Sequence, residues 1–279
     1  MTARTIIITG ASDGIGASAA RTLAAQGDRI VVVGRSAAKT ERIAGETGAD
    51  FFVADFAELA QVRRLAAQLK EKYPRIDVLA NNAGGIMGPR QLTVDGHEKT
   101  FQVNHLAPFL LTTELLDVLN ASRAAVINTS SVANSIFARF DIEDLDAARK
   151  YSTNRAYGNA KLANILFTAE LHRRYHDAGI STAAFHPGGV ATNFAAESTS
   201  PMRVAYTSFL KRFMLTPEQG ADTLVWLANG TPGTDWTSGG YYAKRALSKA
   251  NKMAYDGGLA RELWDRSAAM VALESTPQD

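Results

Sequence analysis

A tyrosine and a lysine four residues apart, Tyr157 and Lys161, form the pair of side chains in this sequence with the clearest capacity for chemistry. On a helix the two residues lie one turn apart and share a face. A free tyrosine loses its proton near pH 10, and a cation held nearby lowers that pKa toward the range useful for proton transfer. Taken alone, such a pair is also common as a solvated or structural pair, so its meaning depends on the rest of the chain.

A glycine-rich loop near the N-terminus predicts a site for a phosphate-bearing ligand. The run from Thr9 to Gly16 reads TGASDGIG and joins a β-branched stretch to an Ala-rich one. Gly10 allows a tight turn, Gly14 lets the backbone approach a pyrophosphate, and Gly16 lets strand and helix pack closely. A plain strand-to-helix turn is the alternative.

The elements that must position these residues alternate regularly along the chain. Short β-branched segments predict strands at 5–9, 29–34, 50–54, 78–80, 124–129, 180–185 and, more weakly, 240–243. Longer Ala- and Leu-rich segments predict helices at 15–26, 57–72, 98–120, 156–178, 217–228 and 259–271. This order predicts an α/β fold with an open, doubly wound, mostly parallel sheet of about seven strands and helices on both faces. We find no repeat or linker, so one domain over residues 1–279 is predicted.

The composition narrows the classes of function. The chain is 46% hydrophobic and 21% charged, with a net charge of +2 and both signs interspersed, which argues against a nucleic-acid partner. It has no cysteine, so no disulfide, thiolate metal site or cysteine nucleophile is available. We see no signal-peptide pattern and no apolar run of the ~18 residues that an integral membrane span needs. A cytoplasmic location is therefore predicted.

Four motifs together resemble the short-chain dehydrogenase/reductase family. The TGxxxGxG loop is followed by Asn81-Asn82-Ala83-Gly84, by the YxxxK run from Tyr157 to Lys161, and by the PGxxxT run from Pro187 to Thr192. They occur in the family's order and cover residues 9–192. The resemblance implies a Rossmann fold, a nicotinamide dinucleotide and hydride transfer, with a small-molecule carbonyl or alcohol as substrate.

The resemblance also implies a set of catalytic residues, with Tyr157 and Lys161 at its centre. Ser131 would polarise the substrate carbonyl, with its neighbour Ser130 as the alternative. Asn104 would support a proton relay from Lys161 through water, and an exposed helical asparagine is the plain alternative.

The cofactor contacts that the resemblance implies extend over all four motifs. Asp55 would contact the adenine, with a turn residue as the alternative, and Thr192 would contact the carboxamide. The whole predicted cofactor set is Gly10, Ser12, Asp13, Gly14, Ile15, Gly16, Arg35, Asp55, Phe56, Asn82, Ala83, Gly84, Tyr157, Lys161, Pro187, Gly188, Val190 and Thr192.

The end of the second strand predicts a preference for NADP(H), with NAD(H) as the second option. An acid there would select NAD, but this chain has Gly34 followed by Arg35, whose guanidinium suits a phosphate. A solvated surface arginine is the alternative. The family's second basic residue in the glycine loop is replaced by Asp13.

Three runs, at residues 104–111, 157–164 and 259–265, resemble the retinol dehydrogenase-like branch of the family. That branch implies NADP(H) and lipophilic aldehydes, ketones, retinoids or steroids. Residues 193–216, with small polar side chains first and Met and aromatic ones afterwards, are predicted to form a lid over the substrate. An amphipathic helix packed on the core, or a membrane or subunit contact, is the alternative.

Other readings of the sequence stay open. A catalytically silent NADP(H)-sensing regulator would need no catalytic tetrad, and an isomerase or dehydratase could use the same fold. His172 and His176 are spaced like metal ligands but lack a third ligand, so no metal site is predicted.

The helix predicted at 156–178 bears on assembly, because it carries two apolar stripes. The second stripe would pack against neighbouring helices or against the same helix of another subunit in a homodimer or homotetramer. The stripes are Ala160, Ala163, Phe167 and Leu171, and Leu162, Ile165, Leu166 and Ala169.

Overall fold

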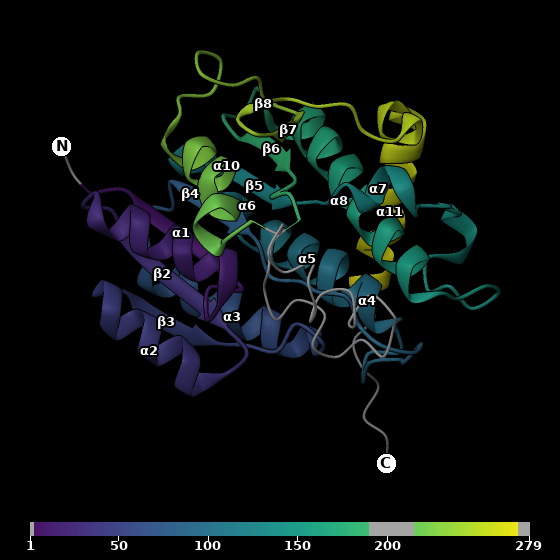
Figure 1. Ribbon diagram of the computed structural model, residues 1–279, viewed down its shortest axis with the longest axis horizontal. Helices are drawn as coiled ribbons and strands as arrows, with labels where there is room; N and C mark the ends of the chain where they lie inside the picture. The colour runs from purple at the N-terminus through teal and green to yellow at the C-terminus, as the bar shows by residue number, and fades with distance from the viewer. Residues whose placement is uncertain (1–2, 190–214, 273–279) are drawn as a thin grey trace.

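The computed structural model describes residues 3–189 and 215–272. Its strands form one sheet in the order β3-β2-β1-β4-β5-β6-β7-β8 (Figure 1). The first seven strands are parallel and β8 pairs antiparallel with β7. The strands are β1 Thr5–Thr9, β2 Arg29–Gly34, β3 Asp50–Val53, β4 Val78–Asn81, β5 Ala125–Thr129, β6 Ser181–Phe185, β7 Gly240–Ala243 and β8 Ala246–Leu247.

Helices cover both faces of this sheet, which confirms the predicted doubly wound α/β fold. One face carries α3, α5, α8 and α11, and its core includes Phe109, Phe167 and Trp264. The other carries α1, α2 and α10 over a core with smaller side chains. The helices are α1 Gly14–Ala25, α2 Ala37–Thr47, α3 Leu59–Lys72, α4 Lys99–Phe101, a π-helix Gln102–Leu106, α5 Ala107–Glu114, α6 Leu116–Ser122, α7 Ala133–Ile136, α8 Thr153–Tyr175, α10 Pro217–Asn229 and α11 Gly257–Ala272. Short 3-10 turns cover Ile142–Asp144 and Lys252–Tyr255.

Helices α2 and α7, strand β8 and the two 3-10 turns were not predicted, and all of them are short or bury few apolar residues. Helix α2 buries only Thr40, Ile43 and Ala44, so its apolar face is small. Strand β8 has two residues, both exposed, and exists through its pairing with β7. The sheet therefore has eight strands rather than about seven.

The segment predicted as one helix over 98–120 is helical from Lys99 to Ser122 except at Leu115, but it is not one regular α-helix, because it is divided into α4, the π-helix, α5 and α6. Pro108 has no N–H to donate to the carbonyl of Asn104, the partner four residues back. At the same point the N–H of Ala107 donates to Gln102 O, five residues back, which is the bond of a π-helix. The carbonyl of Asn104 thus becomes available to a partner outside the helix.

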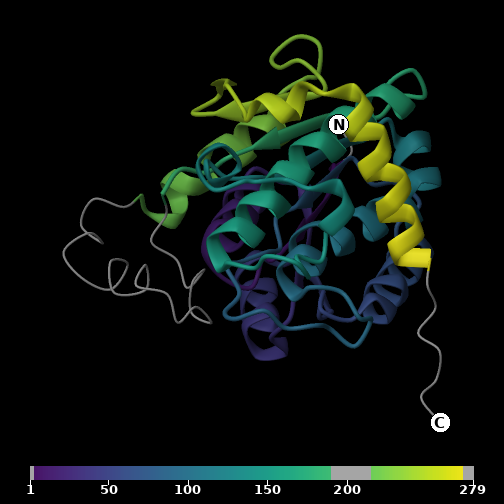
Figure 2. The same cartoon turned by 90° about the vertical axis from the view of Figure 1, so that its right-hand side faces the viewer.

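The described part of α8 is buried on nearly all sides. Every residue of the two predicted apolar stripes except Ala169 is buried. Helix α11 lies against α8 and α5, as Figure 2 shows, and its Trp264 ring is 5.0 Å from that of Phe109 and 5.8 Å from that of Phe167. Within one chain, therefore, α11 covers Phe167 of the first stripe, and the second stripe is buried except at Ala169. Assembly into dimers or tetramers stays a prediction.

Among the helices at 3–189 and 215–272, none combines the length and the apolar composition that crossing a membrane requires.

The strand order reverses beside β1, whose neighbours are β2 and β4. The loops that follow β1 and β4 therefore leave toward opposite faces of the sheet and open a crevice at the carboxyl ends of the strands. The glycine-rich loop follows β1 and the NNAG motif follows β4, so both border this crevice.

Candidate functional site

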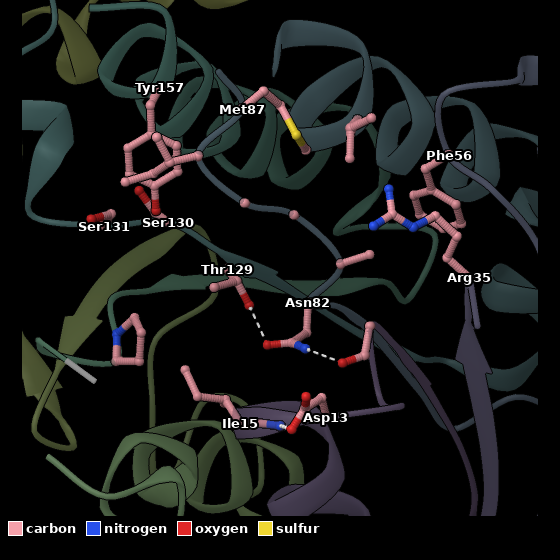
Figure 3. A pocket seen from close by; sticks show the side chains of 18 of the residues that line it. Asp13, Ile15, Arg35, Phe56, Asn82, Met87, Thr129, Ser130, Ser131 and Tyr157 are labelled. Atoms are coloured by element: carbon pink, nitrogen blue, oxygen red, sulfur yellow. Dashed lines mark hydrogen bonds between the residues drawn. The ribbon is translucent and has the colours of Figure 1, made fainter. Parts of the chain in front are cut away.

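A cavity of about 390 Å³ occupies this crevice. Arg35 and Phe56 lie at one end, and Tyr157, Ser130 and Ser131 lie at the other (Figure 3). The predicted residues that line it are Gly10, Ser12, Asp13, Gly14, Ile15, Arg35, Asp55, Phe56, Asn82, Ala83, Gly84, Ser131, Tyr157, Pro187 and Gly188.

Three of the predicted residues that the structure describes do not line this cavity. Gly16, Asn104 and Lys161 lie behind its wall. Val190 and Thr192 fall outside the described residues, as does the predicted lid except for Leu215 and Thr216.

The glycine loop is locked to the NNAG motif by hydrogen bonds and close packing. The Asn82 amide donates to Thr9 O at 3.0 Å and Gly10 O at 3.3 Å. Gly10 has φ +65°, and a Cβ there would lie 2.7 Å from the Cα of Ala83, so only glycine fits. The N-terminus of α1 faces the cavity as a result, and the positive end of the helix dipole suits the pyrophosphate of a dinucleotide.

The Arg35 end of the cavity is partly exposed and carries charges of both signs. Asp13 caps α1 by accepting from Gly14 N, and its carboxylate also pairs with Lys39 Nζ at 3.1 Å. Lys39, on α2, thus offsets the acid that replaces the family's basic residue in the loop. A side chain at Gly34 would collide with Thr40 Oγ1 and with Ser12, which leaves no room for the acid of an NAD-selective site.

Asp55 fits both interpretations that the sequence allowed. Its carboxylate accepts from Ala57 N at 2.9 Å, as a turn residue does, and the residue also lines the cavity beside Phe56.

The two serines after β5 have different surroundings. The Ser130 hydroxyl is buried and donates to the backbone oxygen of Lys161 at 2.7 Å, so it is occupied in tying β5 to α8. Ser131 is half-buried, and its hydroxyl accepts from Ala133 N at 3.2 Å, which leaves the hydroxyl proton for another acceptor. This arrangement favours Ser131 as the serine that contacts a substrate.

Lys161 is 1% exposed and lies beneath Tyr157, with its Nζ 5.5 Å from the centre of the tyrosine ring. The ammonium donates to the backbone oxygen of Thr129 at 3.1 Å. Burial lowers the pKa of this ammonium to about 7. The lysine is thus held by a backbone dipole, close to the tyrosine, at a pKa where it can exchange a proton near neutrality.

Asn104 braces the loop that follows β4. Its side chain donates to Gly85 O at 2.9 Å and accepts from Gly85 N at 3.1 Å. At Gly84, φ is +157° and a Cβ would collide with the Asn104 oxygen, so the NNAG glycine allows the close approach. The side chain therefore has a full set of protein partners, and the exposed-asparagine alternative is wrong because the residue is fully buried.

Sequence reasoning missed the apolar wall beside Tyr157. This wall consists of Ile86, Met87, Ala133 and Phe137, which line the cavity, and all but Met87 pack in one cluster with the tyrosine. Ile86 and Met87 follow the NNAG motif after Gly85, so the apolar character of this pair was a signal available in the sequence.

Comparisons with known proteins agree with this geometry. The short chain dehydrogenase family matches over residues 4–203. A Streptomyces protein named "Putative daunorubicin C-13 ketoreductase DnrU" is 44% identical over 96% of this chain and 92% of its own. Human retinol dehydrogenase 13 is 38% identical over 98% of this chain and 86% of its own. The crystal structure of an uncharacterised Mycobacterium paratuberculosis protein superposes with a TM-score of 0.76 at 33% identity, over 98% and 95% of the two chains.

A doubly wound sheet with a dinucleotide crevice and a buried tyrosine-lysine pair defines an oxidoreductase of the Rossmann type. The chain belongs to the short-chain dehydrogenase family, and its similarity to several retinol dehydrogenases places it in the retinol dehydrogenase-like branch.

Proposed function

We propose that this protein is an NADP(H)-dependent oxidoreductase that interconverts a lipophilic aldehyde or ketone with the corresponding alcohol. The observation that carries the proposal is one continuous cavity with Arg35 at one end and Tyr157 and Ser131 at the other (Figure 3). This arrangement suits an extended ligand that binds by its phosphate at one end and reacts at the other.

Each residue of the reactive end has a role that follows from its place. A bound nicotinamide dinucleotide supplies or accepts the hydride. Tyr157 donates a proton to the carbonyl oxygen during reduction, and Ser131 donates a hydrogen bond to the same oxygen as charge develops. Lys161 stabilises the phenolate that Tyr157 becomes, because its ammonium is held below the ring. Asn104 keeps the Gly85 loop in place beside them.

The preference for NADP(H) rests on three residues around the 2′ position of the adenosine ribose. Arg35 provides a guanidinium that matches a phosphate, Gly34 leaves no room for an acid, and Lys39 offsets the charge of Asp13. An NAD-selective site would need a carboxylate where this chain has Gly34.

The lipophilic substrate is supported by the wall beside Tyr157. Ile86, Met87 and Phe137 present apolar atoms to the place where the substrate carbon must lie. The relatives whose names specify substrates act on daunorubicin and retinol, both of which carry large apolar groups. A lid at 193–216 would add to this wall.

The proposal also covers the setting in which the protein works. One catalytic domain over residues 1–279 and a cytoplasmic location are parts of it, and the absence of cysteine suits a reducing compartment.

A spectrophotometric assay of NADPH oxidation tests the function. We expect turnover with straight-chain aldehydes, and each added methylene should raise kcat/KM about fourfold until the cavity is filled, since burying one contributes ~0.8 kcal/mol. The same assay with aromatic polycyclic ketones and with NADH measures substrate shape and cofactor preference. A flat or falling trend with chain length would overturn the lipophilic substrate. NADPH binding without turnover over the whole panel would favour the silent sensor.

A further inference from the structure

A chain of buried polar groups extends from Lys161 to the C-terminal helix α11. The Thr129 carbonyl accepts from Lys161 Nζ at 3.1 Å and from the side-chain amide of Asn164 at 3.0 Å. That amide also donates to the carbonyl of Asn104 at 3.0 Å. Asn164 oxygen meets His105 Nδ1 at 3.3 Å, and His105 Nε2 meets the Ser267 hydroxyl at 2.9 Å.

All of the side chains in this series of hydrogen bonds are buried. Lys161 is 1% exposed, Asn164 3%, and His105 and Ser267 0%. They come from α8, the π-helix and α11, and Thr129 ends β5. A buried polar group without a partner destabilises the folded state, so the folded state strongly favours the hydrogen bonds among these groups.

Asn164 fixes the donor and acceptor directions in this series of hydrogen bonds. Its amide nitrogen has two protons, and two carbonyl oxygens, those of Thr129 and Asn104, accept them. A flipped amide would place its oxygen against both carbonyls. The Asn164 oxygen must therefore accept from His105 Nδ1–H, which leaves Nε2 to accept from Ser267. Burial lowers the pKa of His105 to about 4, so the ring is neutral and keeps this tautomer near pH 7.

The Asn104 carbonyl is open to Asn164 because the helix cannot use it. Pro108, four residues further on, has no N–H to donate. The proline and the π-helix thus create the acceptor that Asn164 occupies.

We propose that Asn164 is a positioning residue for Lys161, and that His105 and Ser267 hold its amide in the orientation that this task requires. The proposal rests on the proposed function in taking Lys161 as part of the catalytic set. Asn164 and Lys161 share one acceptor, so the amide fixes the place of the Thr129 carbonyl and limits how strongly that oxygen stabilises the ammonium.

The Asn164→Leu variant tests this directly, because leucine is close to asparagine in size and donates no hydrogen bond. The Thr129 oxygen would then serve Lys161 alone, so the pKa of the ammonium should rise by about half a unit or more. We would follow it by NMR in protein labelled with ε-¹³C-lysine, with the signal assigned by Lys161→Met. In the alcohol-ketone assay kcat should fall about tenfold while KM for NADPH changes little, as is typical when a supporting partner is lost.

Thr168→Val is the matched control on the same helix. It removes a buried hydroxyl that donates to the backbone oxygen of Asn164 and accepts from the side-chain amide of Asn128, but it leaves the side-chain amide of Asn164 in place. It should lower the melting temperature and leave the Lys161 titration unchanged, which separates positioning from general destabilisation.

Ser267→Ala provides a milder test at the far end of the chain of bonds. It should raise the Lys161 midpoint in the same direction by about 0.2 units or more, and it decides the matter alone if Asn164→Leu does not fold. If Asn164→Leu folds and the midpoint of the Lys161 titration does not move, the proposal is overturned, whatever happens to stability. If Asn164→Leu does not fold, an unchanged midpoint in Ser267→Ala overturns it. Because the titration needs no turnover, a wild-type chain without oxidoreductase activity would overturn the proposed function and leave this test intact.

Discussion

The two ends of the cavity each use a lysine, and the two lysines work by different physics. Lys39 has a side chain 52% exposed and faces the carboxylate of Asp13 at 3.1 Å. Lys161 is 1% exposed and is held by a backbone carbonyl, with its pKa lowered to about 7 by burial. A charge pair exposed to water is screened and contributes little to stability. In the protein interior, the loss of hydration and the placement of neighbouring dipoles determine whether a group is charged. Changes at the buried end should therefore cost more than changes at the exposed end.

The largest effect is expected at the buried end, from Tyr157→Phe. Losing the group that transfers the proton should lower kcat by about 10² to 10⁴, as for general acids in other enzymes. Binding of NADPH, measured by fluorescence titration, should stay nearly intact and serves as the control. Activity within about tenfold of wild type would show that Tyr157 is not the proton donor, and the buried end would then not be the more sensitive of the two.

The second prediction concerns the pH dependence of stability at His105, also at the buried end. Burial lowers the pKa of His105 to about 4 from the 6.5 of an unfolded histidine, so between these values the unfolded chain binds the extra proton. Stability from this residue is therefore present above pH 6.5 and is lost as the pH falls toward 4. Between pH 7 and pH 5 the loss should be roughly 2 kcal/mol.

Urea unfolding of wild type and His105→Gln at both pH values measures this loss. The variant should be less stable at pH 7 but should lose less on acidification. Equal pH dependence in the two proteins would show that His105 does not carry the effect.

The third prediction moves to the exposed end, where Arg35→Ala should weaken NADPH binding relative to NADH. A charge-assisted bond to a phosphate is worth roughly 1.5 to 3 kcal/mol, which corresponds to about one to two decades in Kd. Kd values for both cofactors, determined in parallel, give the selectivity. If the ratio of the two constants does not change, Arg35 plays no part in the choice.

The smallest effect is expected for Lys39→Ala. An exposed ion pair contributes about 0.2 to 1 kcal/mol, so the affinity for NADPH should fall only a few-fold. The difference from wild type should shrink as NaCl is raised, because salt screens exposed charges. A loss as large as that of Arg35→Ala, or one that survives high salt, would mean that Lys39 is buried against the bound cofactor, and the contrast with Lys161 would have to be revised.

Most of the fold could be predicted because local signals and global order agree. Strands β1, β2 and β7 match the predicted ranges to the residue. Pro108 was visible in the sequence, but its effect depends on the Asn104 carbonyl accepting from Asn164 on another helix. Tertiary contacts of this kind have no local signature.

The candidate site divides in the same way. The motifs placed Ser131, Tyr157 and the glycine loop on one cavity, because each motif carries its own turn or helix geometry. His105 and Ser267, by contrast, are 162 residues apart and meet only when α11 packs on α8. The single domain, the lid and the assembly state remain predictions.

The position of α11 at the end of the described chain has a consequence for folding during synthesis. The ribosome delivers α11 after every other described helix, so the emerging chain has its sheet and α8 before Trp264 arrives to cover Phe109 and Phe167. During that interval an aromatic face lies open to water, and such faces promote aggregation of unfinished chains. Slow translation or early release before residue 257 would prolong the exposure and with it the risk of aggregation.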